Sequence, residues 1–187
     1  MAIKKLMCYP AKYVAGLISV VRKQHRKSPE YENLMCYPAE YVAELISVVR
    51  EQHRKFPEYE KFSRKILNSI LRKASDCHYA DYVSRAALGI ASNRGISLSD
   101  MTWDNQTAKK RDPGRKLFMR DHCVPIRELV DLVLKSNKPV DKIVKRETVA
   151  WITRAENACL DKKEYKDSRP GGWRKCYKEC GIDVVKL

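Results

Sequence analysis

The chain lacks a hydrophobic stretch long enough to cross a membrane, because no segment approaches the roughly 18 consecutive apolar residues that a span requires. Its N-terminus is a poor signal peptide, since Cys8, Tyr9 and Pro10 interrupt any apolar run. The sequence also contains no P-loop, GxGxxG, HExxH or nucleophile-elbow motif, which argues against the nucleotide-binding and hydrolase classes that those motifs mark. We therefore expect a cytoplasmic protein that has no membrane partner.

Acidic residues are in short supply. The 187 residues include 38 Lys and Arg but only 23 Asp and Glu, so the formal net charge is +15. The isoelectric point is near 9.6. An excess of this size favours a nucleic-acid partner, and we expect DNA rather than RNA. The alternative is that the charge only keeps the protein soluble.

Paired CxxC motifs are also missing, although the chain has seven cysteines. An odd number without a secretion signal indicates reduced thiols. Cys176 and Cys180 are spaced to share one helix face, and zinc could bind them together with Cys159 or the Cys77-His78 pair. The alternative is that these cysteines are small buried apolar residues, which we favour over a structural zinc site.

A tandem duplication occupies the N-terminal third. Residues 6–32 and 34–60 have the same sequence at all but four positions. The differences are Lys12/Glu40, Gly16/Glu44, Lys23/Glu51 and Ser28/Phe56. Two copies are too few for a solenoid, which needs three or more repeats to bury a continuous core. We interpret the pair as one duplicated helical segment.

The two copies are predicted to differ in their packing. In the second copy an apolar stripe at helical spacing predicts a buried face; its members are Tyr41, Val42, Leu45, Ile46 and Val49. The first copy has Gly16 where the second has Glu44, which lowers its helix propensity by about 1 kcal/mol. We therefore expect the second copy in the core and the first, residues 1–33, as an appendage. Its surplus apolar face leaves dimerisation or domain swapping open.

The remaining pattern predicts a mainly α fold with a small β component. Residues 34–103 are predicted to be helical, and residues 104–187 to form a mixed α/β region. Helices are expected near residues 58–75, 79–92, 126–137, 140–145 and 173–180, and strands near residues 117–119, 148–152 and 182–185. Thr153-Arg154-Ala155-Glu156 matches a capping box at the start of another helix. On the helix at 58–75 the crowded Lys and Arg face is either solvated or a phosphate contact.

The stretch that carries chemistry is Asp121-His122, at the end of the apolar run 117–119 and three residues before Pro125. An imidazole beside a carboxylate can bind a metal or accept a proton from water. A basic segment precedes and overlaps this stretch, and its cations are the predicted nucleic-acid contacts: Lys109, Lys110, Arg111, Arg115, Lys116 and Arg120. A structural role for the pair at a strand end is the alternative.

The order strand, Asp-His, Pro, connecting segment, strand and capped helix resembles the HNH, or ββα-metal, endonucleases. The resemblance covers about residues 117–162. It implies that His122 is the general base, that Asp121 is a metal ligand, and that Asn157 is a metal-side residue on the final helix. The implied cofactor is a divalent metal ion such as Mg²⁺. The sequence departs from that family because a helix of three or four turns separates the two strands and the zinc-knuckle cysteine pairs are missing.

Two functions follow as hypotheses. The first is metal-dependent hydrolysis of nucleic-acid phosphodiesters, in defence, restriction or a mobile element. The second is a non-catalytic, basic nucleic-acid-binding protein in which Asp121 and His122 are structural.

Overall fold

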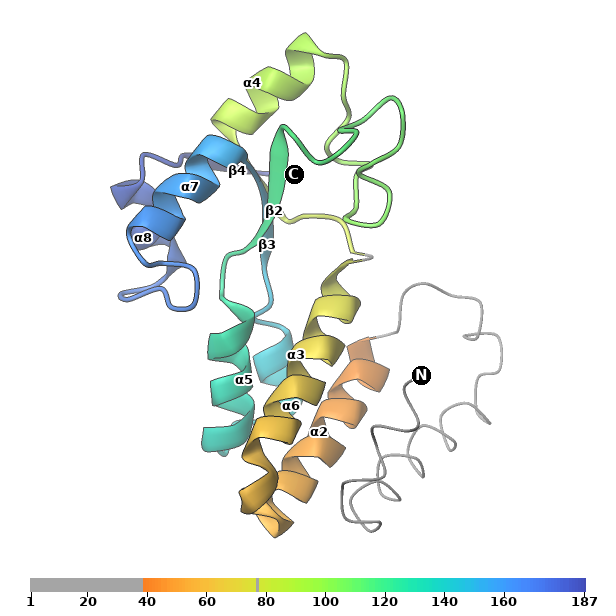
Figure 1. Ribbon diagram of the computed structural model, residues 1–187, viewed down its shortest axis with the longest axis vertical. Helices are drawn as coiled ribbons and strands as arrows, with labels where there is room; N and C mark the ends of the chain where they lie inside the picture. Colours follow the sequence, from red (N-terminus) through yellow and green to blue (C-terminus); the bar gives the residue numbers. More distant parts are fainter. Residues whose placement is uncertain (1–38, 77) are drawn as a thin grey trace.

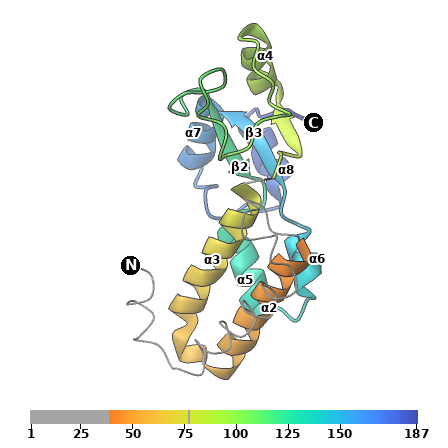
Figure 2. The same cartoon turned by 90° about the vertical axis from the view of Figure 1, so that its right-hand side faces the viewer.

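The computed structural model describes residues 39–76 and 78–187. The first copy of the duplication and the expected appendage lie outside the described residues, as do His25, Cys8, Cys36 and Cys77. Within the described part, helices and a small sheet form two lobes (Figures 1 and 2). The predicted fold class, mainly α with a small β component, is confirmed.

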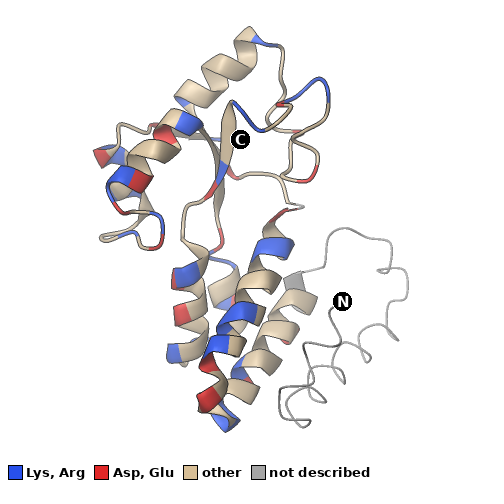
Figure 3. Cartoon of the chain, in the orientation of Figure 1, with Lys and Arg blue, Asp and Glu red and all other residues tan. Residues whose placement is uncertain are grey.

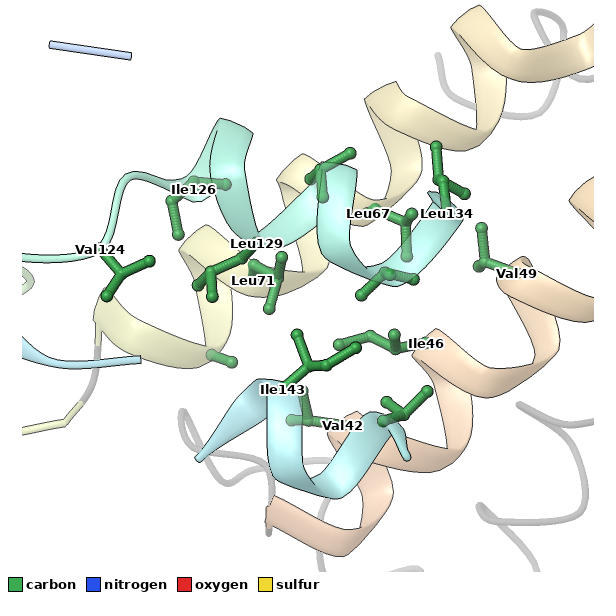
Figure 4. Packing of buried hydrophobic residues seen from close by; sticks show 14 residues of the cluster. Val42, Ile46, Val49, Leu67, Leu71, Val124, Ile126, Leu129, Leu134 and Ile143 are labelled. Atoms are coloured by element: carbon green, nitrogen blue, oxygen red, sulfur yellow. The ribbon is translucent and has the colours of Figure 1, made fainter. Parts of the chain in front are cut away.

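The helical lobe contains α2 (Ala39–Lys55), α3 (Glu60–Asp76), α5 (Ile126–Lys135) and α6 (Val140–Val144). A short 3-10 turn, η3 (Pro57–Tyr59), joins α2 to α3. The four helices bury one apolar cluster, to which α2 contributes Val42, Ile46 and Val49 (Figure 4). The predicted stripe on α2 is correct at these three positions, whereas Tyr41 and Leu45 are only half-buried.

The sheet lobe has four strands in the order β2-β3-β1-β4. They are β1 (Tyr82–Ser84), β2 (Phe118–His122), β3 (Val149–Thr153) and β4 (Val184–Lys186). The central strands β1 and β3 are parallel, and each has an antiparallel partner on its outer side. Strand β2 is therefore an edge strand, and its last residue is His122.

Three helices cover the two faces of this sheet. Helix α4 (Arg85–Asn93) packs Ala87 and Ala91 into the cluster on the face of Phe118 and Trp151. Helices α7 (Arg154–Lys162) and α8 (Trp173–Glu179) pack on the other face. There Leu160 and Tyr177 form a separate apolar cluster with Ala150 and Ile152 of β3. The predicted capping box is confirmed, because Thr153 and Glu156 exchange both hydrogen bonds at the start of α7.

Two expectations need correction. The helix predicted over 79–92 is in fact strand β1 followed by α4, because Tyr82 and Val83 pair with strands that come much later in the chain. A boundary near residue 104 does not separate the lobes. Helices α5 and α6 pack with α2 and α3, and β1 lies in the centre of the sheet.

Candidate functional site

Asp121 and His122 end the edge strand and point to opposite faces of the sheet, as adjacent strand residues do. Phe118, two positions before Arg120, packs with Trp151 on the face covered by α4. Met119 and Cys123 pack with Ala150 and Ile152 on the face covered by α7 and α8. His122 therefore shares its face with Phe118 and Arg120, and Asp121 lies on the side of α7 and α8.

A cavity of about 560 Å³ opens at the end of β2, between α3, α5 and the segment that follows α7. Both Asp121 and His122 line it. Six cations also line it: Arg64, Arg72, Arg120, Arg127, Lys135 and Lys166. We call this cavity the basic pocket. Figure 3 shows the Lys and Arg positions along α3 and α5 of the helical lobe.

Much of the acidic charge in the basic pocket is already paired. Asp131 accepts from Arg64 at 2.7 Å and lies 3.1 Å from the Lys135 amine. Asp167 pairs with Arg127 at 3.2 Å, where both side chains are exposed. No ion pair forms at Arg72 or Lys166 within the described residues, so these two cations remain available for an anionic ligand.

His122 turns one ring nitrogen inward and leaves the other accessible. Its Nδ1 is buried without a hydrogen bond, 3.7 Å from Oε1 of Glu147. Within the described residues Nε2 makes no hydrogen bond to protein and is not fully buried, and the His122 side chain lines the basic pocket. Burial, with the nearby cations Arg120 and Arg72, lowers the pKa of His122 to about 3. The ring is therefore neutral at pH 7 and can accept a proton on Nε2.

Glu147 precedes β3 and is almost as buried as His122, with side chains 11% and 15% exposed. Burial raises the pKa of Glu147 to about 7, although the positive charge of Arg120 works in the opposite direction. At 3.7 Å the two side chains are close enough to form an ion pair if the imidazole is protonated. The direction of both pKa shifts instead favours a neutral imidazole beside a carboxyl that exchanges its proton near pH 7.

Arg120 is buried and holds α3 against the sheet. Its guanidinium donates to the Ser75 hydroxyl, the Ser75 carbonyl and the His78 carbonyl. It also lies 4.0 Å from Asp76. Its side chain is 2% exposed, so Arg120 positions α3 beside His122 and supplies positive charge to the wall of the basic pocket.

Asp121 is occupied by protein partners. Both of its oxygens accept from Arg169 at 3.0 Å, and Tyr177 donates to Oδ2 at 2.5 Å. Burial raises the pKa of this carboxyl, and Arg169 and Tyr177 oppose that shift. With its oxygens engaged in this way, Asp121 does not fit the role of an open metal ligand.

Asn157 is separate from the basic pocket. It lies on α7 and donates to Asp161 one turn later, at 3.1 Å. Asn157 does not line the pocket that Asp121 and His122 share. The structure thus brings His122 and Asp121 to one cavity and leaves Asn157 out. In residues 39–76 and 78–187, no three His, Cys, Asp or Glu side chains are grouped as metal ligands would be, and this includes Cys159, Cys176 and Cys180.

The predicted basic loop lies at the other end of β2. The buried carboxylate of Asp112 holds this loop in place by accepting hydrogen bonds from the backbone N–H groups of Lys116, Leu117 and Phe118. Arg115 stacks 3.7 Å above the Trp103 ring, and Arg111 is half-buried. Lys109, Lys110 and Lys116 are exposed. Because β2 runs from this loop to His122, these cations form a surface distinct from the basic pocket.

Sequence reasoning missed Glu147, which no motif marks. It also missed the pocket residues Arg127, Lys135 and Lys166. A signal for the α3 wall was available, because Arg64, Asn68 and Arg72 recur every four residues and so share one helix face. The fold was needed to show that this face lies beside His122.

No protein-family model, curated protein or solved structure matches this chain. Among the described residues, no helix combines the length and the hydropathy of a membrane span.

Proposed function

We propose that this protein hydrolyses phosphodiester bonds of nucleic acid in the basic pocket, with His122 as the general base. One observation carries the proposal. The accessible Nε2 of a neutral imidazole lines a pocket rich in cations, and a buried carboxyl lies behind its other nitrogen. Access and an unprotonated ring are both required of a general base at neutral pH, and an ionised Glu147 would strengthen this weakly basic imidazole by stabilising its protonated form.

In the proposed reaction, His122 Nε2 accepts a proton from a water molecule as the water oxygen bonds to phosphorus. Glu147 faces Nδ1 and stabilises the imidazolium that forms. Arg72 and Lys166 offset the charge that develops on the phosphoryl oxygens. The bond from phosphorus to one ester oxygen breaks, and that oxygen leaves as a hydroxyl after it takes a proton from solvent water, while His122 afterwards releases its own proton to solvent.

The proposal includes the divalent ion that the family resemblance implies, but assigns no step to it. To bind such an ion, Asp121 would have to release Arg169 and Tyr177. Cleavage measured with added Mg²⁺ and with excess chelator tests this part separately.

A second candidate function is nucleic-acid binding without cleavage. The engagement of Asp121 by Arg169 and Tyr177 favours it, because this carboxylate then serves the fold rather than a metal. Under this alternative the cations of the basic pocket bind phosphate, and His122 and Glu147 form part of the pocket wall.

A cleavage assay distinguishes the two. Labelled single- and double-stranded DNA and RNA are incubated with the wild type, His122→Ala and His78→Ala. His78 is a matched control, because its side chain is exposed and does not line the basic pocket. We expect His122→Ala to lose cleavage by about 100- to 10,000-fold and to retain binding. Binding without cleavage by the wild type supports the second candidate, and equal cleavage by all three proteins refutes the assignment of His122.

A further inference from the structure

The groove that holds α2 in the helical lobe matches a second segment of the same chain. It is formed by α3, α5 and α6, and it receives Val42, Ile46 and Val49 from α2 (Figure 4). Two polar contacts secure α2 further along. Arg50 donates to the Lys138 carbonyl at 2.6 Å, and Arg54 donates to the Asn137 side chain at 2.9 Å.

All five of these contact residues are present in the first copy of the duplication. The counterparts, 28 positions earlier, are Val14, Ile18, Val21, Arg22 and Arg26. Of the positions at which the copies differ, the three with described side chains in the second copy lie elsewhere. Glu51 is exposed and pairs only with Lys55 on its own helix, and Glu44 and Phe56 are half-buried outside the apolar cluster.

We propose that residues 11–27 of the same chain are an alternative occupant of this groove and can replace α2. The contacts of α2 and the sequence identity of the two copies support this exchange independently of the proposed nuclease function. The same chain is the favoured source, because a covalently linked segment competes at a high effective concentration.

The exchange has a consequence for charge. Two Glu-to-Lys differences and one Glu-to-Gly difference make the first copy five charges more positive than the second over the helical stretch. With the first copy in the groove, the helix would carry Lys at the positions of Glu40 and Glu51 and Gly at the position of Glu44, so the helical lobe would gain positive charge. A more basic lobe attracts polyanions more strongly.

The duplication allows a deletion that keeps the register. Removing residues 33–60 joins Glu32 to Lys61, so that the first copy runs directly into α3 with the same sequence around the junction. We expect this variant to unfold cooperatively, with a melting temperature no more than about 10 °C below that of the full chain. Adding Ile18→Asp to the deletion should abolish folding. A non-cooperative melt of the deletion variant overturns the proposal.

Point variants of the full chain test the exchange without a deletion. Ile46→Asp places a charge in the core, and we expect the first copy to take over, so that the lobe stays folded and monomeric. The double variant Ile18→Asp/Ile46→Asp should lose the helical lobe, while Ile18→Asp alone should melt like the wild type. If Ile46→Asp unfolds as completely as the double variant, the first copy does not replace α2. If Ile46→Asp folds only as a dimer on size-exclusion chromatography, the occupant comes from a second chain and the proposal is wrong.

Discussion

Oε1 of Glu147 lies 3.7 Å from Nδ1 of His122, and both atoms are buried without a hydrogen-bond partner. Burial raises the pKa of the carboxyl to about 7 and, with two nearby arginines, lowers that of the imidazole to about 3. In the unfolded chain these groups return to the ordinary values of 4.5 and 6.5. Folding therefore changes which of the two groups holds a proton between pH 4.5 and 6.5.

This proton exchange predicts a pH-dependent effect of Glu147→Gln. The contribution of His122 to stability is present above pH 6.5 and is lost as the pH falls towards 3. The contribution of Glu147 is present below pH 4.5 and is lost as the pH rises through 7. In the wild type the two pH dependences of the unfolding free energy have opposite signs and cancel between pH 4.5 and 6.5. In Glu147→Gln only the slope of His122 remains, so the unfolding free energy should rise by about 1.4 kcal/mol per pH unit relative to the wild type.

Urea unfolding of both proteins at several pH values between 4.5 and 6.5 measures this difference. The Glu128→Gln variant, on the first turn of α5, serves as a carboxyl control and should follow the wild type. Parallel pH profiles for the wild type and Glu147→Gln would mean that the two groups are not shifted as described.

Breaking the buried pair of Arg169 and Asp121 should destabilise the sheet lobe strongly. Arg169→Met leaves a buried carboxyl without its cation, which costs about 3–5 kcal/mol of unfolding free energy. The double variant Asp121→Asn/Arg169→Met should recover part of that loss, because no charge then remains unpaired. Chemical denaturation of Asp121→Asn, Arg169→Met and the double variant, compared with the wild type, gives the coupling energy. A coupling energy near zero would show that the two side chains do not interact in solution.

Two groups of cations could contact nucleic acid, those of the basic pocket and those of the loop before β2. The salt dependence of binding distinguishes them. If the pocket binds the nucleic-acid backbone, Arg72→Glu should weaken binding and lower the slope of log affinity against log salt by about one unit. The Lys109→Glu/Lys110→Glu variant alters only the surface at the other end of β2 and tests the contact predicted from sequence. Fluorescence anisotropy at several salt concentrations shows which variant changes the slope. A change confined to the loop variant would move the binding surface away from His122.

Asp112 should be required for the ordered loop at residues 104–116. Its carboxylate accepts three consecutive backbone N–H groups and the Gln106 amide at 2.8 Å. Asp112→Ala leaves these donors without an acceptor and should lower the unfolding free energy by about 2–3 kcal/mol. Asp100→Ala, at an exposed position, should cost much less. Thermal melts of the two variants provide the comparison, and equal melting temperatures would contradict the role of Asp112.

Local signals in the sequence predicted most of the elements. The β-branched run before Thr153 and the capping box defined β3 and the start of α7, and apolar spacing defined α5. Strand β1 was missed because it has only three residues, and its pairing partners are Ala150, Trp151 and residues 184–186. Periodicity over a short window carries no information about partners so distant in the chain.

The site was predictable only in part, for a similar reason. The sequence marked Asp121 and His122 as a pair with catalytic potential. Adjacent residues of a strand point to opposite faces of the sheet, however, so the two side chains contact different partners. Asp121 meets Arg169 and Tyr177 from the C-terminal segment, and His122 meets Glu147 from the approach to β3. These partners are 25 to 56 positions away in the sequence, and no motif links them.

The central position of β1 also constrains how the chain can fold. Its neighbours are β3, more than 60 residues later, and β4, about 100 residues later. During synthesis on the ribosome, β1 therefore has neither partner strand until most of the chain has been made. Contacts over such long sequence separations slow folding. Until β3 arrives, residues 82–84 expose an unpaired strand edge that can pair with other chains.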